Sequence, residues 1–318
     1  MSEKYETIVP SEPDAGERLQ WVSWLRSAAP YVHLHHGRTF VISFAGEVVA
    51  DRTLLNHLVM DVSLIASMGM RVVLVHGSRP QIEELMSLRK LEGQFYKGVR
   101  ITGPQELECV KEACGETRFD IEAAFSQGLP NTPMQHSRIK VVSGNFVTAR
   151  PMGIIDGVDY LHTGVVRKVD AESIQDLLSR GNIVLVSPTG FSPTGEAFNL
   201  TTEDVATAIA VAIHADKLIL SVGVDGVRIQ GEKQQDLTAQ QAQALIQSKQ
   251  VDDEDVYNLG YALRAIKGGV DRVHIVPYAM DGGILTELFT HDGVGTMIST
   301  ENMESLREAT IDDVAQSR

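Results

Sequence analysis

One segment constrains the fold of this chain more than any other, the near-continuous apolar run RVVLVH at residues 71–76. A strand that is apolar on both faces must be covered on both faces, which is typical of parallel sheets in α/β proteins. The run follows a strand-like segment at 39–45 and a segment in which apolar residues recur at helical spacing between Leu54 and Ile65. Asp51 is expected to cap this helix. Strand, helix and strand in this order predict a βαβ unit with parallel strands.

The same alternation continues along most of the chain. The predicted helices lie at 104–127, 171–179, 203–214, 237–248 and 255–267, and the predicted strands at 139–142, 159–162, 165–169, 182–188, 217–222, 272–276 and 295–298. Alternating strands and helices predict an α/β protein, a three-layer α/β/α sandwich with a mainly parallel central sheet.

The two ends of the chain differ from this pattern. Residues 1–16 have no apolar period and are expected to be disordered, and residues 17–36 are expected to form a helix interrupted at Pro30. The tryptophans of that helix, Trp21 and Trp24, need a partner surface. One domain is therefore expected over 17–300, followed by a charged tail at 301–318.

Composition excludes several classes of function. The net charge is −14, from 28 basic and 42 acidic residues, so nucleic acids and anionic membranes would be repelled. No apolar run approaches the about 18 residues of a transmembrane helix, and the amino terminus lacks the apolar core of a signal peptide. Cys109 and Cys114 are the two cysteines. Their spacing, with no histidine nearby, predicts neither a disulfide nor a metal site, and a cytoplasmic location is expected.

Two glycine loops follow the first two predicted strands. Residues 43–46 (SFAG) end the first strand, and residues 76–81 (HGSRPQ) join the second strand to a helix. Backbone N–H groups at a helix start bind anions, although a glycine after a strand is often only a turn. On adjacent parallel strands both loops would lie at the carboxyl edge of the sheet, where α/β folds bind ligands.

Two later segments also carry polar residues at strand ends. In the first, Asn199 is expected to cap the helix after it, with Glu203 in the first turn, and capping and ligand binding both remain open. In the second, Glu287 stands among Leu285, Leu288 and Phe289. A carboxylate buried in such a helix without a partner is costly, so a cationic ligand is expected to satisfy it.

In their order along the chain these segments resemble the motifs of the amino-acid-kinase family. That family has K-x-G-G, H-G-G-G-P, G-x-R-V-T, N-x-N-A-D and G-x-G-T-x-I, and the counterparts here are residues 43–46, 76–80, 98–102, 199–203 and 293–298. The resemblance implies the amino-acid-kinase fold over residues 17–300.

The departures from those motifs concern the catalytic groups. Ser43 replaces the family's first lysine, Ser78 and Arg79 replace glycines, and Glu203 stands for the aspartate. No lysine occurs between Gln250 and Ile266, where the second catalytic lysine is expected. Phosphoryl transfer depends on positioning and positive charge, so kinase activity should fall by roughly 10³ or more.

The same departures resemble the amino-terminal half of the bacterial N-acetylglutamate synthases. The runs that carry this resemblance are HGSRPQI, SGNFVTARP, SPTGEAFNL, HIV and LTELFT. The resemblance implies a regulatory domain that binds L-arginine as allosteric inhibitor, in an enzyme that forms N-acetylglutamate from glutamate and acetyl-CoA, the first step of arginine synthesis. Acetyl transfer belongs there to a carboxyl-terminal domain, which uses acetyl-CoA. Residues 301–318 resemble the linker and the start of that domain, and no cofactor or catalytic residue is expected before them.

The resemblance also implies two sets of site residues. The arginine-binding set is Tyr31, His274, Ile275, Glu287, Thr290 and Gly293. The vestigial substrate and nucleotide set is Ser43, Gly46, Gly77, Ser78, Arg79, Arg100, Asn199 and Glu203. Helix packing for Tyr31, and a hydrogen-bonded core histidine for His274, stay open as alternatives.

Assembly and competing functions complete these expectations. In arginine-sensitive relatives the amino-terminal helix interlaces with a neighbouring subunit and builds a hexamer from dimers, a use that Trp21, Trp24 and Leu25 would suit. The chief alternative is an active acetylglutamate kinase, favoured by Arg100, because the kinases hold the substrate carboxylate in that segment. A further possibility is a separate acetyltransferase chain that acts as a partner in trans.

Overall fold

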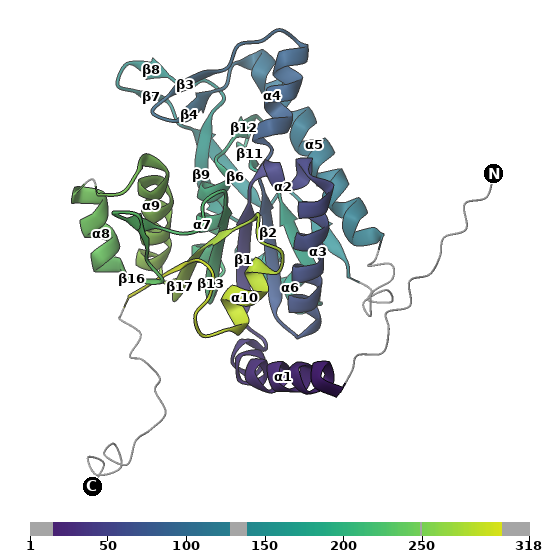
Figure 1. Cartoon of the computed structure of the whole chain (residues 1–318). Coiled ribbons are helices and arrows are strands. Elements are labelled where there is room, and N and C mark those ends of the chain that lie inside the picture. Colours follow the sequence, from purple (N-terminus) through teal and green to yellow (C-terminus); the bar gives the residue numbers. More distant parts are fainter. Residues whose placement is uncertain (1–14, 128–138, 249, 301–318) are drawn as a thin grey trace, which may run out of the picture.

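The computed structural model describes residues 15–127, 139–248 and 250–300, which form a three-layer α/β/α sandwich (Figure 1). Its central sheet has eight strands in the order β16-β18-β17-β13-β1-β2-β10-β5. Their bounds are β1 Thr39–Phe44, β2 Arg71–His76, β5 Val141–Ser143, β10 Ile183–Val186, β13 Lys217–Val222, β16 Asp236–Thr238, β17 Arg272–Pro277 and β18 Thr296–Ser299. Within this sheet, only the β17–β18 pair is antiparallel. The predicted fold class is confirmed.

The buried strands explain why helices cover both faces. In β1 every residue is buried, with Phe40 and Ile42 in one apolar cluster and Val41 in another. Alternate side chains of a strand point to opposite faces, so each face needs its own helical layer. The helices are α3 Arg52–Ser67, α5 Pro104–Ser126 and α10 Gly283–Phe289 on the Phe40 face, and α6 Ala171–Ser179, α7 Thr202–Ala212, α8 Ala239–Ser248 and α9 Asp253–Lys267 on the Val41 face.

Smaller elements surround the carboxyl edge of the central sheet. They are the helices α2 Gly46–Ala50 and α4 Arg79–Leu88, a four-stranded sheet, and three hairpins. The sheet comprises β12 Ala197–Asn199, β11 Thr189–Phe191, β6 Val147–Pro151 and β9 Gly164–Val169; the hairpins comprise β3 Gln94–Tyr96 with β4 Val99–Ile101, β7 Ile154–Ile155 with β8 Val158–Asp159, and β14 Arg228–Ile229 with β15 Glu232–Lys233.

The strand expected at 159–162 is mostly wrong. Only Asp159 belongs to a strand, β8, and Leu161 has a φ of 53°. A leucine in the left-handed region turns the chain and cannot continue an extended strand.

The amino-terminal helix α1 (Ala15–His35) runs through Pro30 without a break, so the predicted interruption is wrong. Proline removes one N–H donor, and the carbonyl left without it belongs to Arg26, which is exposed and can bond to water. Residues 15 and 16, expected to be disordered, already belong to this helix. The remainder of the predicted disordered segment and the predicted linker at 301–318 lie outside the described residues.

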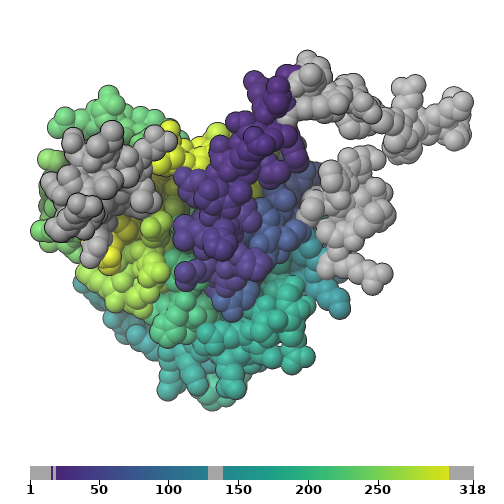
Figure 2. All heavy atoms as spheres, turned by 90° about the horizontal axis from the view of Figure 1, so that it is seen from below, coloured from purple at the N-terminus to yellow at the C-terminus, as the bar shows by residue number. Residues whose placement is uncertain are grey.

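Figure 2 shows α1 lying across the lower face of the molecule. The helix packs against α10, and its last residue, His35, places Nε2 at 3.1 Å from the carbonyl oxygen of Leu288. Its other side is open, since Leu19, Trp21 and Trp24 are 72%, 65% and 52% exposed.

The two predicted helix caps have different outcomes. Asp51 caps α3 as predicted, because its carboxylate accepts from the N–H groups of Thr53 and Leu54. Asn199 does not cap α7: it belongs to β12, its amide donates to Thr102 Oγ1 at 3.0 Å, and Thr201 takes the cap position. Because β12 extends through Asn199, the cap position falls two residues later, at Thr201.

Two further expectations concern the thiols and the membrane. Cys109 and Cys114 are both free and buried in this structure. Among the residues that the structure describes, none of the helices is long and apolar enough to span a bilayer.

Candidate functional site

The two glycine loops meet at the carboxyl edges of β1 and β2, which are parallel neighbours as predicted. The N–H of Gly77 donates to the carbonyl of Phe44 at 2.7 Å. A Cβ atom on Gly77 would lie 2.7 Å from the nitrogen of Gly46, and one on Gly46 would lie 2.7 Å from Oε1 of Gln81. These glycines are therefore needed for the loops to pack on each other.

The interior of the second loop consists of neutral polar groups. His76 is fully buried, and burial lowers its pKa to about 4. Its ring bonds to Ser187 Oγ at 2.8 Å and to Ser78 Oγ at 3.2 Å. Ser43 is 3% exposed within β1. Where a kinase would place a lysine and a bare glycine backbone, this chain thus has two serines and an uncharged histidine.

The first turn of α4 links two other predicted residues through one that the sequence did not suggest. Arg79 Nε lies 3.0 Å from Glu83 Oε1, and Arg100 Nη2 lies 3.3 Å from the same oxygen. Arg100 thus joins the second loop through Glu83. The available signal was the four-residue spacing of Arg79 and Glu83, which places them on one helix face.

Glu203 and Asn199 lie in different surroundings. The side chain of Glu203 accepts from the hydroxyl of Tyr257 at 3.1 Å, and burial raises the pKa of Glu203. Its neighbour Asp204 pairs with Arg264 at 2.6 Å. Asn199 bonds instead to Thr102, in the segment that also carries Arg100. The predicted vestigial set therefore spans several contact groups rather than one.

The second candidate region is a buried chain of three side chains. Lys217 Nζ lies 3.0 Å from His274 Nε2, and His274 Nδ1 lies 2.6 Å from Glu287 Oε1. Because an ammonium can only donate, Nε2 of His274 must accept and Nδ1 must carry the proton that binds Glu287. The chain therefore runs from a cation through a neutral imidazole to an anion.

The pKa values agree with this assignment of charges. Burial, followed by the charge of Lys217, lowers the pKa of His274 to about 4. Burial and the charge of Arg272 lower the pKa of Lys217 to about 8. For Glu287, burial alone would raise the pKa, but bonds from His274 and from two backbone N–H groups lower it to about 2. At neutral pH Glu287 is thus an anion and His274 is uncharged.

The loop after α10 supplies those two N–H groups. Glu287 Oε2 accepts from Val294 at 2.7 Å and from Gly295 at 2.9 Å. Gly293 has a φ of 60°, and a Cβ atom there would lie 2.5 Å from Glu287 Oε2. The expectation that Glu287 has no partner without a ligand is therefore wrong, because His274 and this loop already satisfy it.

The structure brings most of the predicted arginine-binding residues together. Gly293 donates to Thr290 Oγ1 at 3.3 Å, and Ile275 pairs with Thr296 on β18. Tyr31 lies on α1 and packs against the apolar cluster that contains Leu288 and Phe289, the residues after Glu287. Lys217 belongs to the buried chain with His274 and Glu287, and sequence reasoning missed it. The available signal was a lysine in an otherwise apolar strand.

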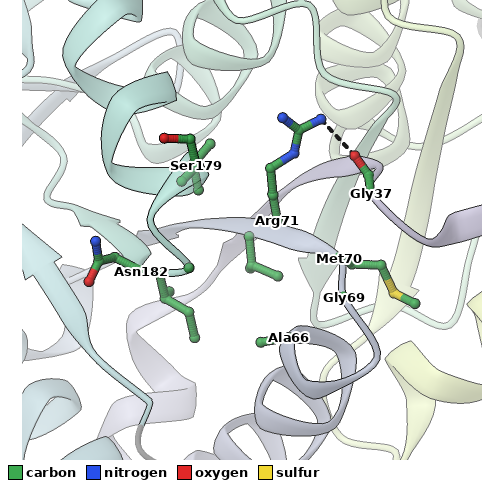
Figure 3. Close-up of a pocket in the computed structure, with 11 residues that line it drawn as sticks. Gly37, Ala66, Gly69, Met70, Arg71, Ser179 and Asn182 are labelled. Carbon is green, nitrogen blue, oxygen red and sulfur yellow. Dashed lines mark hydrogen bonds between the residues drawn. The ribbon is translucent and has the colours of Figure 1, made fainter.

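A cavity of about 510 Å³ lies at the opposite, amino edge of the sheet, where β2 and β10 begin (Figure 3). Arg71 is the charged residue of its lining and donates to the carbonyl of Gly37 at 2.6 Å. The Asn182 amide donates to the carbonyl of Leu177. The volume of this cavity is ordinary for a ligand pocket. None of the predicted site residues lines it, and the polar side chains of Arg71 and Asn182 bond to backbone carbonyls.

The sequence profile of the Amino acid kinase family matches residues 38–277. The chain belongs to this family. It is 55% identical over 303 residues to an amino-acid acetyltransferase of Ralstonia nicotianae, covering 95% of this chain and 67% of the relative. The chain thus spans about two thirds of the length of that relative.

Solved structures agree with this assignment. N-acetylglutamate synthase from Neisseria gonorrhoeae complexed with coenzyme A and L-arginine matches with a TM-score of 0.84 and 35% identity, over 93% of this chain and 69% of that chain. The same enzyme complexed with coenzyme A and N-acetyl-glutamate matches with a TM-score of 0.81 and 35% identity, over 93% and 67% of the two chains. The chain therefore has the fold of the part of N-acetylglutamate synthase that it matches.

Proposed function

We propose that this chain is an arginine-binding regulatory domain of the N-acetylglutamate synthase type. The observation that carries the proposal is the ionised, buried Glu287, held between His274 and the loop N–H groups of residues 294 and 295. A carboxylate fixed in this way offers a preorganised partner to a guanidinium, which pairs with carboxylates through a planar fork of donors. The Neisseria enzyme that the chain resembles binds L-arginine.

The carboxylate of Glu287 has an unused hydrogen-bond acceptor position for such a contact. A carboxylate accepts about four hydrogen bonds, and Glu287 receives one at Oε1 and two at Oε2. A guanidinium donor can therefore join at Oε1 without breaking the bond to His274. Helix α1, which contacts α10 through His35 and Leu288, would close over the ligand with Tyr31.

Loss of phosphoryl transfer is part of the same proposal. Ser43 and Ser78 bring no positive charge to the carboxyl edge, and the guanidinium of Arg79 is paired with Glu83. A transferring phosphoryl group needs cations at fixed positions. In this proposal the parent reaction, acetyl transfer from acetyl-CoA to glutamate, belongs to an acetyltransferase domain or partner chain, so acetyl-CoA consumption by residues 1–318 should be blank.

Assembly follows from the exposed side of α1. We infer that residues 17–36 mediate association into a hexamer, because Trp21 and Trp24 would otherwise expose large apolar surfaces to water. A second copy of α1 offers a matching apolar surface. Arginine bound between α1 and α10 would then act on the interface between subunits, which would make the inhibition allosteric.

A thermal-shift titration with two ligands of nearly equal shape tests arginine binding. L-citrulline replaces the guanidinium of L-arginine by a neutral urea. At 100 times its dissociation constant a ligand stabilises by about 2.7 kcal/mol, so arginine should raise Tm by several degrees, and citrulline should not. Equal shifts with both ligands, or none with arginine, would refute the proposal.

Residual acetylglutamate kinase activity is the alternative function. The observation that favours it is Arg100, which is 8% exposed at the carboxyl edge, the position of a substrate-carboxylate ligand in the kinases. Release of ADP from ATP in the presence of N-acetylglutamate measures it. We expect no turnover above a blank that lacks N-acetylglutamate; clear turnover would replace the regulatory assignment.

A further inference from the structure

Glu83 lies between two guanidinium groups near the start of α4. Its Oε1 atom is 3.0 Å from Arg79 Nε and 3.3 Å from Arg100 Nη2. Both guanidiniums also lie over the ring of Phe95, with their central carbons 5.5 Å and 4.6 Å from its centroid. Two cations thus share one aromatic ring and one hydrogen-bonded carboxylate, while Glu106 contributes only its charge to Arg100.

Arg100 is enclosed and cannot turn away from this position. Its side chain is 8% exposed, and Nη1 lies 3.2 Å from the sulfur of Met86. A Cβ atom on Gly93 would lie 2.8 Å from Nη1, so the backbone also borders the group. Burial lowers the pKa of Arg100, whereas the charge of Glu83 raises it. A guanidinium held in this way needs an anionic partner.

Glu83, in contrast, is free to move. Its side chain is 50% exposed, as is expected on the outer face of α4. Rotation about its side-chain bonds would uncover both guanidiniums without any shift of the helix. The first turn of α4 adds its own preference for negative charge. An enclosed Arg100 and an exposed Arg79 that share one movable carboxylate form a site with a built-in competitor.

We propose that Glu83 is an internal carboxylate ligand of Arg79 and Arg100 that excludes free dicarboxylates from the carboxyl edge of the sheet. A tethered carboxylate has an effective concentration in the millimolar range or above. A free dicarboxylate must compete with it and therefore binds weakly in the wild-type chain. The inference is independent of the arginine site, because Glu83 bonds to Arg79 and Arg100, whereas Glu287 bonds to His274 and to the loop at residues 294 and 295.

Calorimetric titration of the full chain with glutarate, a simple dicarboxylate, tests this inference. In Glu83→Gln the side chain keeps its length and loses its charge, so glutarate affinity should rise about tenfold or more, the effect of removing a competitor worth a partly buried ion pair. The matched control is Glu84→Gln, which changes the same charge at an exposed position of the same helix. It should leave the affinity at the wild-type value.

A double variant assigns the gain to the guanidiniums. Arg79 is 69% exposed and can be replaced without opening the core, so Glu83→Gln with Arg79→Gln should lose most of the gain. Glu83→Ala provides a second removal of the carboxylate, and circular dichroism confirms the fold of each variant. Equal glutarate affinity in wild type, Glu83→Gln and Glu83→Ala would overturn the inference. Arginine affinity should stay unchanged in all of them, which separates this result from failure of the arginine proposal.

Discussion

His274 Nδ1 lies 2.6 Å from Glu287 Oε1, and the two side chains are only 4% and 5% exposed. The imidazole is uncharged, because Lys217 occupies its other nitrogen as a donor at 3.0 Å. The negative charge of Glu287 is thereby balanced by a cation two hydrogen bonds away. This relationship fixes the position of α10 on the sheet and sets the electrostatics of the proposed arginine site.

Replacement of His274 should destabilise the fold strongly. In His274→Leu, which keeps a similar volume, Lys217 and Glu287 lose the group that joins them while both remain buried. Breaking a buried pair costs about 3–5 kcal/mol, and urea denaturation should show a loss near the lower limit. The control is His291→Leu, at a position 74% exposed, where the change should be small. A loss of unfolding free energy below about 1 kcal/mol in His274→Leu would contradict the stabilising role of the chain formed by Lys217, His274 and Glu287.

Acid should remove the stabilisation that Glu287 supplies. Its pKa is lowered from 4.5 to about 2 in the folded chain, so the unfolded chain takes up the proton first as pH falls. The contribution is complete above pH 4.5 and is lost as the pH falls toward 2, amounting to about 3 kcal/mol at 1.4 kcal/mol per unit. Unfolding free energies measured between pH 2 and 6 should show this slope in wild type. The slope should be smaller in Glu287→Gln.

Asp61 should have the opposite dependence on pH. Burial, helped by the charge of Asp281, raises the pKa of Asp61 from 3.8 to about 7, against hydrogen bonds from the backbone of Ile284 and Leu285. Its contribution is complete below pH 3.8 and declines as the pH rises toward 7.

The matched comparison is Asp61→Asn against Asp120→Asn, which is exposed on α5. Above pH 7 the Asp61 variant should be more stable than wild type, by up to about 4 kcal/mol. The Asp120 variant should equal wild type throughout. Urea denaturation across this pH range measures the unfolding free energy of both variants. A wild-type unfolding free energy that rises between pH 5 and 7, with no such rise in Asp61→Asn, would show that the sign is wrong.

The exposed tryptophans of α1 should control the size of the assembly. Trp21→Ser with Trp24→Ser removes two large apolar surfaces that are 65% and 52% exposed. If they bind another copy of α1, the mass from light scattering should fall from a hexamer to a dimer. Leu88→Ser, at a site 74% exposed on α4, is the control that should keep the hexameric mass. A wild-type monomer would refute the assembly itself.

The predicted parts of the fold were those with local causes. The apolar run at 71–76 demanded helices on both faces, and the order of strands and helices fixed parallel pairing, which the register of β1 with β2 confirms. Asp51 could be recognised as a cap because its partners, the N–H groups of Thr53 and Leu54, follow it directly. The interruption predicted at Pro30 was wrong because Arg26, whose carbonyl loses its N–H donor, is exposed to water. That exposure cannot be read from the sequence.

The electrostatics of the sites could not be predicted in the same way. Lys217 and His274 are 57 residues apart, and their contact depends on the pairing of β13 with β17. Without that register, the sequence predicts that Glu287 needs a cationic ligand. Glu83 and Arg100 likewise meet only when the hairpin β3–β4 returns beside α4. Whether a charged side chain can bind a ligand therefore depends on the partners it meets in the folded chain, and not on its residue type alone.

The most direct test of the central claim is calorimetric titration with L-arginine of the wild-type chain, of Glu287→Gln, and of Glu196→Gln as a control at a side chain 52% exposed. Glu287→Gln keeps the shape of the side chain and removes the charge that would bind the guanidinium. The account predicts binding to wild type and to the control with the same affinity, and at least a tenfold weaker affinity for Glu287→Gln. No heat with wild type, or equal affinity in all three chains, would contradict it.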